Sequence, residues 1–160
     1  MKRRFKILVK TGQFKVTGDS KVLITHGLGS CVALTLYDEK VKIGGMLHYI
    51  LPENPGDGKK ANYVDTGIEL LIQEMIRFGT KKERMVAKLI GGAIMFEEFI
   101  KDKENSIGMR NIKKGRKILG DLGIPILSED VGGGYGRSVE FDLSNGKVCI
   151  NSYKLGIKII

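Results

Sequence analysis

The segment THGLGSCVAL, residues 25–34, places a cysteine directly after a glycine-rich turn and at the start of an apolar run. A thiolate is a strong nucleophile, and glycines let a substrate approach the backbone closely, so Gly27, Gly29 and Ser30 are the predicted substrate-binding residues. The backbone N–H of Cys31 could stabilise a developing oxyanion. On this segment alone, a buried residue that begins a core strand explains Cys31 as well, because free cysteine is among the most buried residue types.

Two histidines are available to activate this thiol. His26 is close to Cys31 in sequence, which by itself does not bring the two side chains together. His48 lies in the apolar segment GMLHYIL, which we expect to pair with the Cys31 strand through a turn at residues 38–40. A hairpin centred there pairs positions whose numbers sum to about 79, which places Cys31 level with His48. This register favours His48 as the general base, although a lone strand histidine is also common as a satisfied core residue.

The other motifs give weaker evidence for a catalytic or binding site. GLGSCV lacks the third glycine of a dinucleotide-binding fingerprint, and no glycine-rich loop ends in Gly-Lys-Ser/Thr. Two cysteines and two histidines without CxxC or HxxxH spacing argue against a zinc site, so no metal is expected. The segment GGGYGR, residues 132–137, is either an anion-binding loop or a plain connection between strands. Cys149 alternates with Val148 and Ile150 in an expected strand and is interpreted as core packing.

The composition is typical of a globular protein. The chain has 160 residues, of which 42% are apolar and 28% charged, and this suits a single domain spanning residues 1–160. No apolar run is long enough to cross a membrane, and charged residues interrupt the N-terminal MKRRFKILVK, so neither membrane insertion nor export is expected. Two cysteines are too few for a disulfide framework. We therefore expect a cytoplasmic protein with reduced thiols.

The net charge is +9, from 27 basic and 18 acidic side chains. Such an excess can attract nucleic acid, a membrane surface or an acidic protein. The lysines are spread along the chain, and neither a basic recognition helix nor an aromatic RNA-binding motif is present, so no nucleic acid partner is expected. A solvated surface and an acidic macromolecular partner both remain compatible with the charge.

Hydrophobic periodicity predicts many strands and two principal helices, which indicates an α+β or mixed α/β single domain. The helices are expected over residues 64–78, where Gly79 ends the pattern, and over residues 106–123. Gly44-Gly45 suggests a bulge or a close backbone approach, and Asn145-Gly146 is typical of a hairpin turn. The expected strands cover residues 5–9, 14–17, 21–25, 31–37, 41–50, 85–93, 124–130, 137–143 and 147–153.

Five segments, in this order across nearly the whole chain, together resemble the CheD family of chemoreceptor glutamine deamidases in bacterial and archaeal chemotaxis. They are THGLGSCVALTLYD, GGMLHYILP, AKLIGGAIMF, IGMRN and IPILSEDVGGGYGRSVEFD. The resemblance implies that the catalytic cysteine, histidine and threonine of the family fall on Cys31, His48 and Thr25. No catalytic role is implied for His26. The implied fold is that of bacterial toxin deamidases, a β-sheet sandwich with helices packed outside.

The resemblance also implies an activity and its partners. Such enzymes convert glutamine side chains in the cytoplasmic helices of methyl-accepting chemotaxis receptors to glutamate and release ammonia, which tunes adaptation. Cys31 would attack the carboxamide, His48 would transfer the proton, and Thr25 would orient the imidazole. No cofactor is needed. Family members also bind the CheC phosphatase, which acts on the response regulator CheY.

Two alternatives remain open at this point. The protein could act mainly as a non-catalytic binding module that regulates a phosphatase or a receptor. It could also use the same thioester chemistry as a methylesterase on receptor methyl esters.

Overall fold

The computed structural model describes residues 4–160 of the chain. These residues form ten β-strands in two five-stranded sheets, two α-helices and four short 3-10 helices. In chain order the elements are β1 (Lys6–Leu8), β2 (Phe14–Thr17), β3 (Val22–Leu28), β4 (Val32–Asp38), β5 (Ile43–Tyr49), η1 (Lys60–Asn62), α1 (Val64–Arg77), η2 (Lys82–Arg84), β6 (Val86–Gly91), η3 (Glu97–Phe99), η4 (Lys103–Asn105), α2 (Ile107–Asp121), β7 (Ile126–Val131), β8 (Arg137–Asp142), β9 (Val148–Ser152) and β10 (Gly156–Ile159).

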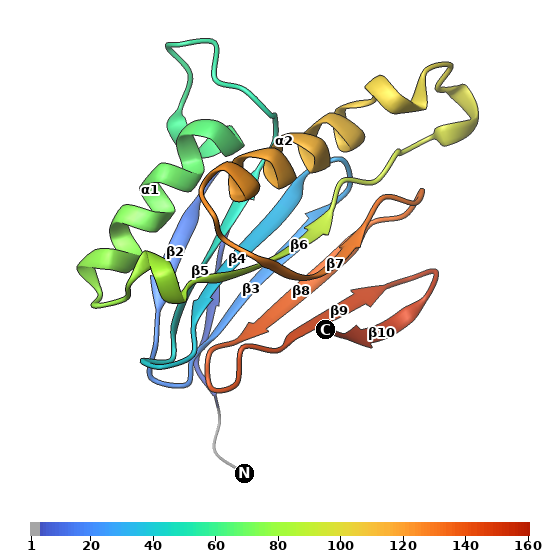
Figure 1. Ribbon diagram of the computed structural model, residues 1–160. Coiled ribbons are helices and arrows are strands. Elements are labelled where there is room, and N and C mark those ends of the chain that lie inside the picture. Colours follow the sequence, from blue (N-terminus) through green and yellow to red (C-terminus); the bar gives the residue numbers. More distant parts are fainter. Residues whose placement is uncertain (1–3) are drawn as a thin grey trace.

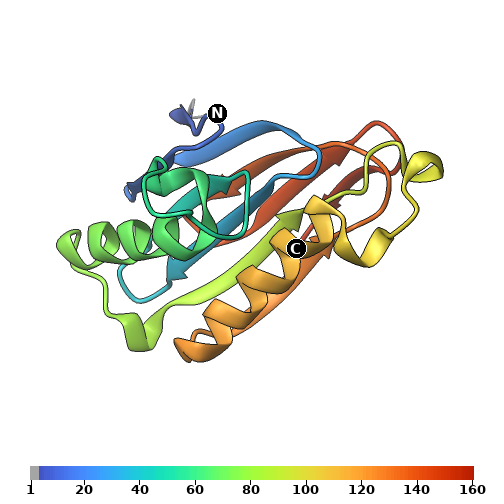
Figure 2. The ribbon, with the colours of Figure 1, turned by 90° about the horizontal axis from the view of Figure 1, so that it is seen from above.

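The two sheets stack face to face, and both helices lie on one of them (Figure 1). We call the sheet with strand order β2-β5-β4-β6-β7 the central sheet and the sheet with order β1-β3-β8-β9-β10 the outer sheet. Both sheets are mixed, because the β1–β3 and β6–β7 pairs are parallel. Viewed from above, α1 and α2 lie next to each other across the central sheet (Figure 2). The predicted α+β sandwich with outer helices is therefore confirmed.

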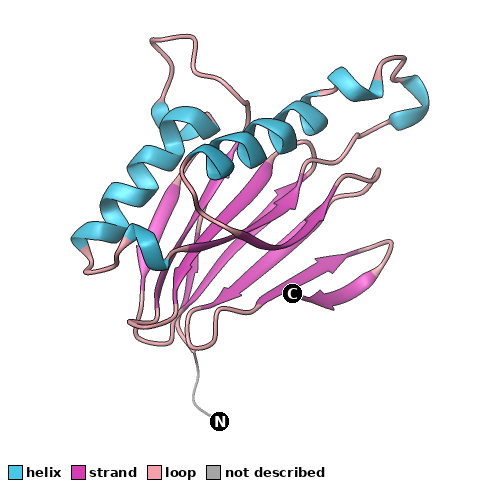
Figure 3. Ribbon diagram, in the orientation of Figure 1, coloured by secondary structure: helices cyan, strands magenta, loops and turns pink. Residues whose placement is uncertain are grey.

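The helices cover the central sheet only. Within residues 4–160, no helix packs on the far face of the outer sheet (Figure 3). The chain thus has two cores, one between the helices and the central sheet and one between the two sheets, which we call the inter-sheet core. Strand β4 lies in the middle of the central sheet and all seven of its residues are buried. Leu34 and Leu36 face the helices while Ala33 and Tyr37 face the inter-sheet core, which explains its nearly continuous apolar sequence.

The expected hairpin between β4 and β5 is present, but its register differs by two residues from the prediction. Ala33, rather than Cys31, lies directly opposite His48. The difference arises because the strands end at the Asp38–Ile43 pair, which makes the turn longer and moves its centre. Side chains alternate between faces with a period of two, so a shift of two residues keeps Cys31 and His48 on the same face.

Gly44 and Gly45 allow close packing rather than a bulge, since the β4–β5 pairing is regular through both. A Cβ atom at Gly44 would lie 2.6 Å from Leu143 Cδ1, and one at Gly45 would lie 2.5 Å from Leu71 Cδ1. One glycine therefore lets the outer sheet approach β5, and the other lets α1 approach it.

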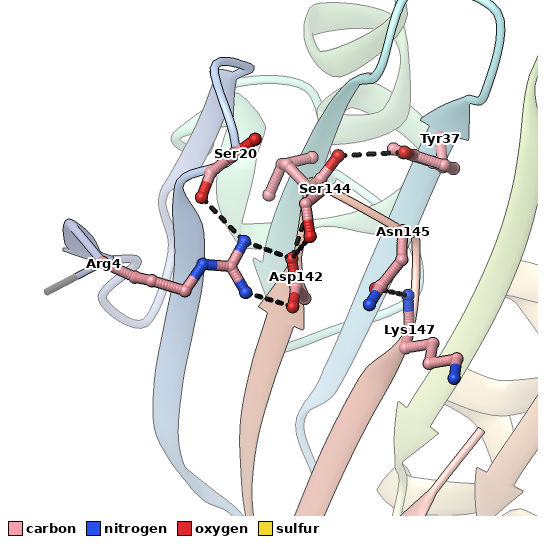
Figure 4. Close-up of polar contacts among 8 residues, drawn as sticks. Arg4, Ser20, Tyr37, Asp142, Ser144, Asn145 and Lys147 are labelled. Carbon is pink, nitrogen blue, oxygen red and sulfur yellow. Dashed lines mark hydrogen bonds and ion pairs between the residues drawn. The ribbon is translucent and has the colours of Figure 1, made fainter. Parts of the chain in front are cut away.

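The predicted turn at Asn145-Gly146 connects β8 to β9 (Figure 4). Gly146 has a φ of +77°, a conformation that favours glycine, and Asn145 Oδ1 accepts a hydrogen bond from Lys147 N at 2.9 Å. The adjoining Asp142 side chain pairs with Arg4 and holds the turn against the N-terminal segment. The prediction of this hairpin is confirmed.

Two expectations about the last strands were wrong. Strand β10 was not expected, although its apolar residues Ile157 and Ile159 alternate with Lys158 as in an exposed strand. Cys149 was expected in the core. It lies on β9 opposite Glu140, on the face of the outer sheet that points away from the central sheet, and it is only partly buried. Val148 and Ile150, which flank Cys149 on β9, point into the inter-sheet core instead.

Candidate functional site

Thr25 and His48 meet in the space between the two sheets. Thr25 comes from β3 of the outer sheet, His48 comes from β5 of the central sheet, and both are fully buried. Both point inward, because Leu23 and Met46, two residues before them on their strands, belong to the inter-sheet core. Thr25 Oγ1 lies 2.8 Å from His48 Nδ1. The structure thus brings together two of the three predicted catalytic side chains.

The second hydrogen bond of Thr25 fixes the tautomer of His48. The Thr25 hydroxyl donates its single proton to the Val9 carbonyl at 2.7 Å, so it must accept a hydrogen bond from His48 Nδ1–H. A neutral imidazole with its proton on Nδ1 presents an unprotonated Nε2. Within residues 4–160, His48 Nε2 is buried and has no hydrogen-bond partner. This nitrogen is therefore ready to accept a proton.

Cys31 lies on the same face as His48. It immediately precedes β4 and packs, partly buried, against the inter-sheet core that contains Ala33. Since Ala33 faces His48 directly, Cys31 is its diagonal neighbour, a relation that separates two residues by about 7–8 Å, and their Cβ atoms by somewhat less, in antiparallel sheets. In the part of the chain that the structure describes, no hydrogen bond joins the Cys31 thiol to His48.

Burial keeps both groups uncharged in the free protein. It raises the pKa of the Cys31 thiol, and the N–H of Cys31 itself partly offsets this effect. Burial also lowers the pKa of His48 from its ordinary value of 6.5 to about 4. Because both shifts disfavour the charged forms, the resting site holds a neutral thiol and a neutral imidazole rather than a thiolate–imidazolium pair. Among the described residues, no charged neighbour contributes to the shift of the Cys31 pKa.

Of the predicted substrate-binding residues, Gly27 lies near the end of β3, and Gly29 and Ser30 form the turn that leads to Cys31. Gly27 has a φ of +69°, which favours glycine, and the β3–β8 register shifts between Thr25 and Leu28. The turn ends at Gly29 and Ser30, where the chain crosses from the outer sheet to the central sheet. It therefore allows Thr25 and Cys31 to approach His48 from different sheets.

Neighbouring segments hold this turn through its carbonyl groups. Gly29 O accepts a hydrogen bond from Ala93 N at 2.8 Å, and Cys31 O accepts one from Gly92 N at 2.8 Å. Ser30 O accepts a hydrogen bond from the Asn111 side chain at 2.9 Å. The backbone around the thiol is thus anchored to the segment after β6 and to α2.

A pocket of about 430 Å³ opens beside the turn, between Ser30, the segment after β6 and the start of α2. The segment that supplies Met95 and Ile100 to its lining also exposes two apolar side chains, Phe96 at 72% and Phe99 at 77%, which we call the apolar rim. Met95, which lines the pocket, approaches Gly29 closely. Sequence reasoning missed this apolar rim, because its residues do not follow a helix or strand pattern.

Comparison with known proteins identifies the family. A family model described as CheD chemotactic sensory transduction matches residues 50–152. A protein of Geobacter metallireducens named as a probable chemoreceptor glutamine deamidase CheD 2 is 41% identical over 156 residues, which cover 95% of this chain and 96% of that protein. The chain belongs to the CheD family.

Two further relatives of this CheD chain are similar over most of their length. A probable chemoreceptor glutamine deamidase CheD of Pyrococcus abyssi is 46% identical over 145 residues, 89% of this chain and 88% of that protein. The chemoreceptor glutamine deamidase CheD of Thermotoga maritima is 40% identical over 146 residues, 91% of this chain and 90% of that protein.

His26 and the glycine-rich loop do not contribute to the inter-sheet site of this CheD chain. His26 is exposed on the outer sheet, where its Nδ1 lies 3.3 Å from Ser138 Oγ. Residues 132–136 connect β7 to β8, as one of the two interpretations of GGGYGR expected. Arg137 of that motif is buried and pairs with Asp130 at 3.0 Å, so its charge is compensated by a carboxylate.

Asn111 was not predicted as a site residue, although it lies in the IGMRN segment. It is fully buried on α2, on the same helix face as Gly108, Ile112 and Gly115. A polar residue on an otherwise apolar helix face was the available signal.

Among residues 4–160, no helix is long and apolar enough to cross a membrane.

Proposed function

We propose that this protein is a cysteine-dependent deamidase, which converts specific glutamine side chains of methyl-accepting chemotaxis receptors to glutamate. The observation that carries the proposal is the Thr25–His48 hydrogen bond, which leaves His48 Nε2 unpaired on the face that holds Cys31. The names of the relatives, chemoreceptor glutamine deamidases, supply the substrate and the reaction class.

In the first step, Cys31 attacks the carboxamide carbon while His48 Nε2 takes the thiol proton. A preformed thiolate is not required, since a positioned base can remove the proton as the new bond forms. Entry of the substrate excludes water from the site and brings the carboxamide carbon of the glutamine next to the thiol. We propose that the resulting tetrahedral oxyanion accepts a hydrogen bond from the Cys31 N–H, while Gly27, Gly29 and Ser30 bind the substrate beside it.

In the second step, the protonated His48 gives its proton to the departing nitrogen, and ammonia leaves. The remaining thioester is hydrolysed by water, with His48 again acting as base, which yields glutamate and restores the thiol. Thr25 accepts from Nδ1–H throughout, so it keeps Nε2 directed toward the reaction and stabilises the transient imidazolium. These steps use no cofactor.

The proposed partners are the cytoplasmic helices of the receptor and the CheC phosphatase, which places the protein in the cytoplasm. The pocket beside Ser30 lies next to the turn that leads to Cys31 and is large enough, at about 430 Å³, to hold a glutamine side chain, although Cys31 and His48 are not among the residues that line it. The exposed apolar rim at Phe96 and Phe99 supports contact with a protein surface next to that pocket.

The experiment is mass spectrometry of a receptor cytoplasmic fragment incubated with the protein. Deamidation predicts a gain of about one mass unit at particular glutamines, the difference between an amide and an acid. The Cys31→Ala variant is the control. Loss of a methylene mass from methylated glutamates would instead establish a methylesterase, and an unchanged fragment that nevertheless binds would establish a binding module.

A further inference from the structure

Asn111 joins the two chain segments that carry Cys31 and His48. Its side-chain Nδ2 donates one hydrogen bond to Ser30 O at 2.9 Å and another to Ile50 O at 2.8 Å. Ser30 immediately precedes Cys31, and Ile50 follows His48 by two residues. The two carbonyl groups lie just beyond Val32–Tyr49, the last pair of the β4–β5 ladder. Asn111 therefore bridges neighbouring strands at the point where their backbone pairing stops.

The orientation of the amide follows from its partners. Both are carbonyl oxygens, which only accept, so the NH2 group must face them and Oδ1 must point away. Within residues 4–160, Asn111 Oδ1 is buried without a hydrogen-bond partner. An unpaired buried acceptor destabilises the folded state. The side chain thus bears that cost at a position where one of its N–H groups holds Ser30 and the other holds Ile50.

The helix approaches the strands closely enough for a short side chain to reach them. A Cβ atom at Gly108 would lie 2.3 Å from Ala93 O, and one at Gly115 would lie 2.7 Å from Tyr49 Oη. Tyr49 Oη donates to the Asn111 carbonyl at 2.7 Å, so β5 also holds the backbone of Asn111. This bond is separate from the two bonds that the Asn111 side chain makes to Ser30 and Ile50.

We propose that Asn111 is a positioning residue for the deamidation site, which fixes the Cys31 turn relative to the His48 strand. Cys31 lies just beyond the last β4–β5 pair, and its backbone is held on the β6 side by the hydrogen bonds from Gly92 and Ala93. The Asn111 side chain adds the link from Ser30 to the segment after His48, so it contributes to the separation of the sulfur and Nε2. The kinetic part of this proposal rests on the deamidase function proposed above. Its structural part, the restraint of Cys31, does not.

Tyr49→Phe provides a matched control for Asn111→Leu. Tyr49→Phe removes the hydrogen bond to the Asn111 backbone but leaves both bonds of its side chain to Ser30 and Ile50. Asn111→Leu removes those two bonds and keeps a side chain of similar size. Thermal unfolding measures the stability of both variants. Asn111→Ser, whose hydroxyl can donate to only one carbonyl, replaces Asn111→Leu if that variant does not fold; if neither folds, the proposal fails.

The first readout is steady-state deamidation of the receptor fragment. We expect Asn111→Leu to lower kcat at least 10-fold at nearly unchanged KM, because it displaces the thiol from the base without altering the pocket rim. Tyr49→Phe should retain a kcat within about 2-fold of the parent. Equal effects of the two variants on kcat, at equal stability, would overturn the positioning role.

The second readout is the pH dependence of Cys31 alkylation by iodoacetamide, followed by mass spectrometry, with no receptor present. Release of the turn exposes the thiol, so in Asn111→Leu its pKa should fall toward the ordinary value and alkylation near neutral pH should become faster. An alkylation profile identical to that of Tyr49→Phe would contradict the restraint. If the alkylation profiles of the parent and of Asn111→Leu differ as predicted but the parent modifies no receptor glutamine, the deamidase proposal fails while this restraint stands.

Discussion

Thr25 and His48 belong to different sheets, yet a 2.8 Å hydrogen bond between Oγ1 and Nδ1 joins them at the centre of the inter-sheet space. Because Thr25 gives its own proton to the Val9 carbonyl, the bond has one direction, from imidazole to hydroxyl. The packing of one sheet on the other therefore sets the protonation pattern of the candidate base.

Thr25→Val should lower the deamidation rate about 10-fold or more while the protein remains folded. Valine has nearly the same shape but no hydroxyl, so His48 loses the acceptor that holds its tautomer, and Val9 O loses its donor. The measurement is kcat on the receptor fragment together with thermal unfolding. Thr25→Ser retains the hydroxyl and is the control. Equal activity in Thr25→Val and the parent would remove Thr25 from the mechanism.

Cys31→Ala should abolish deamidation and leave the fold intact, because only the nucleophile is lost. Cys149→Ala should keep full activity, since Cys149 lies on the far face of the outer sheet. Mass spectrometry of the receptor fragment and thermal unfolding of each variant give the comparison. Glutamate formation by Cys31→Ala at the parental rate would refute the proposed nucleophile.

His48→Ala should reduce turnover by a factor of about 10² or more, the usual contribution of a general base. His26→Ala should change it little, because His26 contacts Ser138 on the exposed face of the outer sheet. Both rates are measured on the same receptor fragment at neutral pH. Greater damage from the His26 variant would move the base to the outer surface, contrary to the geometry.

Activity should persist to lower pH than an ordinary histidine would allow. A base must be unprotonated, and burial lowers the pKa of His48 to about 4, so the acid limb of kcat/KM should fall near pH 4 rather than near 6.5. An acid limb near 6.5 in the free enzyme would show that His48 is not the base or is not buried there.

The same shift links stability to pH. The unfolded chain binds a proton on His48 below about pH 6.5 while the folded chain does not until about pH 4, so stability is lost as pH falls through this range. Between pH 7.5 and pH 5 the loss should be about 2 kcal/mol. Urea unfolding of the parent and of His48→Gln at both pH values isolates this contribution, which the variant should lack.

The loop after β5 offers a test of the partner surface. Lys59 and Lys60 are exposed in the PENPGDGKKAN segment, which leaves β5 shortly after His48. If they meet receptor carboxylates, the double variant Lys59→Glu, Lys60→Glu should deamidate more slowly and respond less to salt, since such contacts steer encounter. Identical salt curves for parent and variant would leave the loop as a solvated turn.

Much of the fold was determined by local sequence. Apolar periodicity identified both helices and all strands except β10, because a buried face repeats every 3.6 residues in a helix and every two in a strand. Asn145-Gly146 identified its hairpin, since few residues other than glycine adopt the positive φ that this turn requires. For the site, the glycine turn and strand histidine indicated Cys31 and His48, and the family resemblance added Thr25.

Only the tertiary structure decided how these residues meet. The β4–β5 register depends on the length of a turn whose residues permit several conformations, so the sequence placed Cys31 and His48 on one face but two residues out of register. The tautomer of His48 depends on Val9 and Thr25, and the restraint on Cys31 depends on Asn111 of α2. These contacts join segments far apart in the chain, and local patterns do not encode which distant carbonyl a hydroxyl or amide will reach. Sequence thus determined which groups are available, and the packing of two sheets and a helix determined their protonation and spacing.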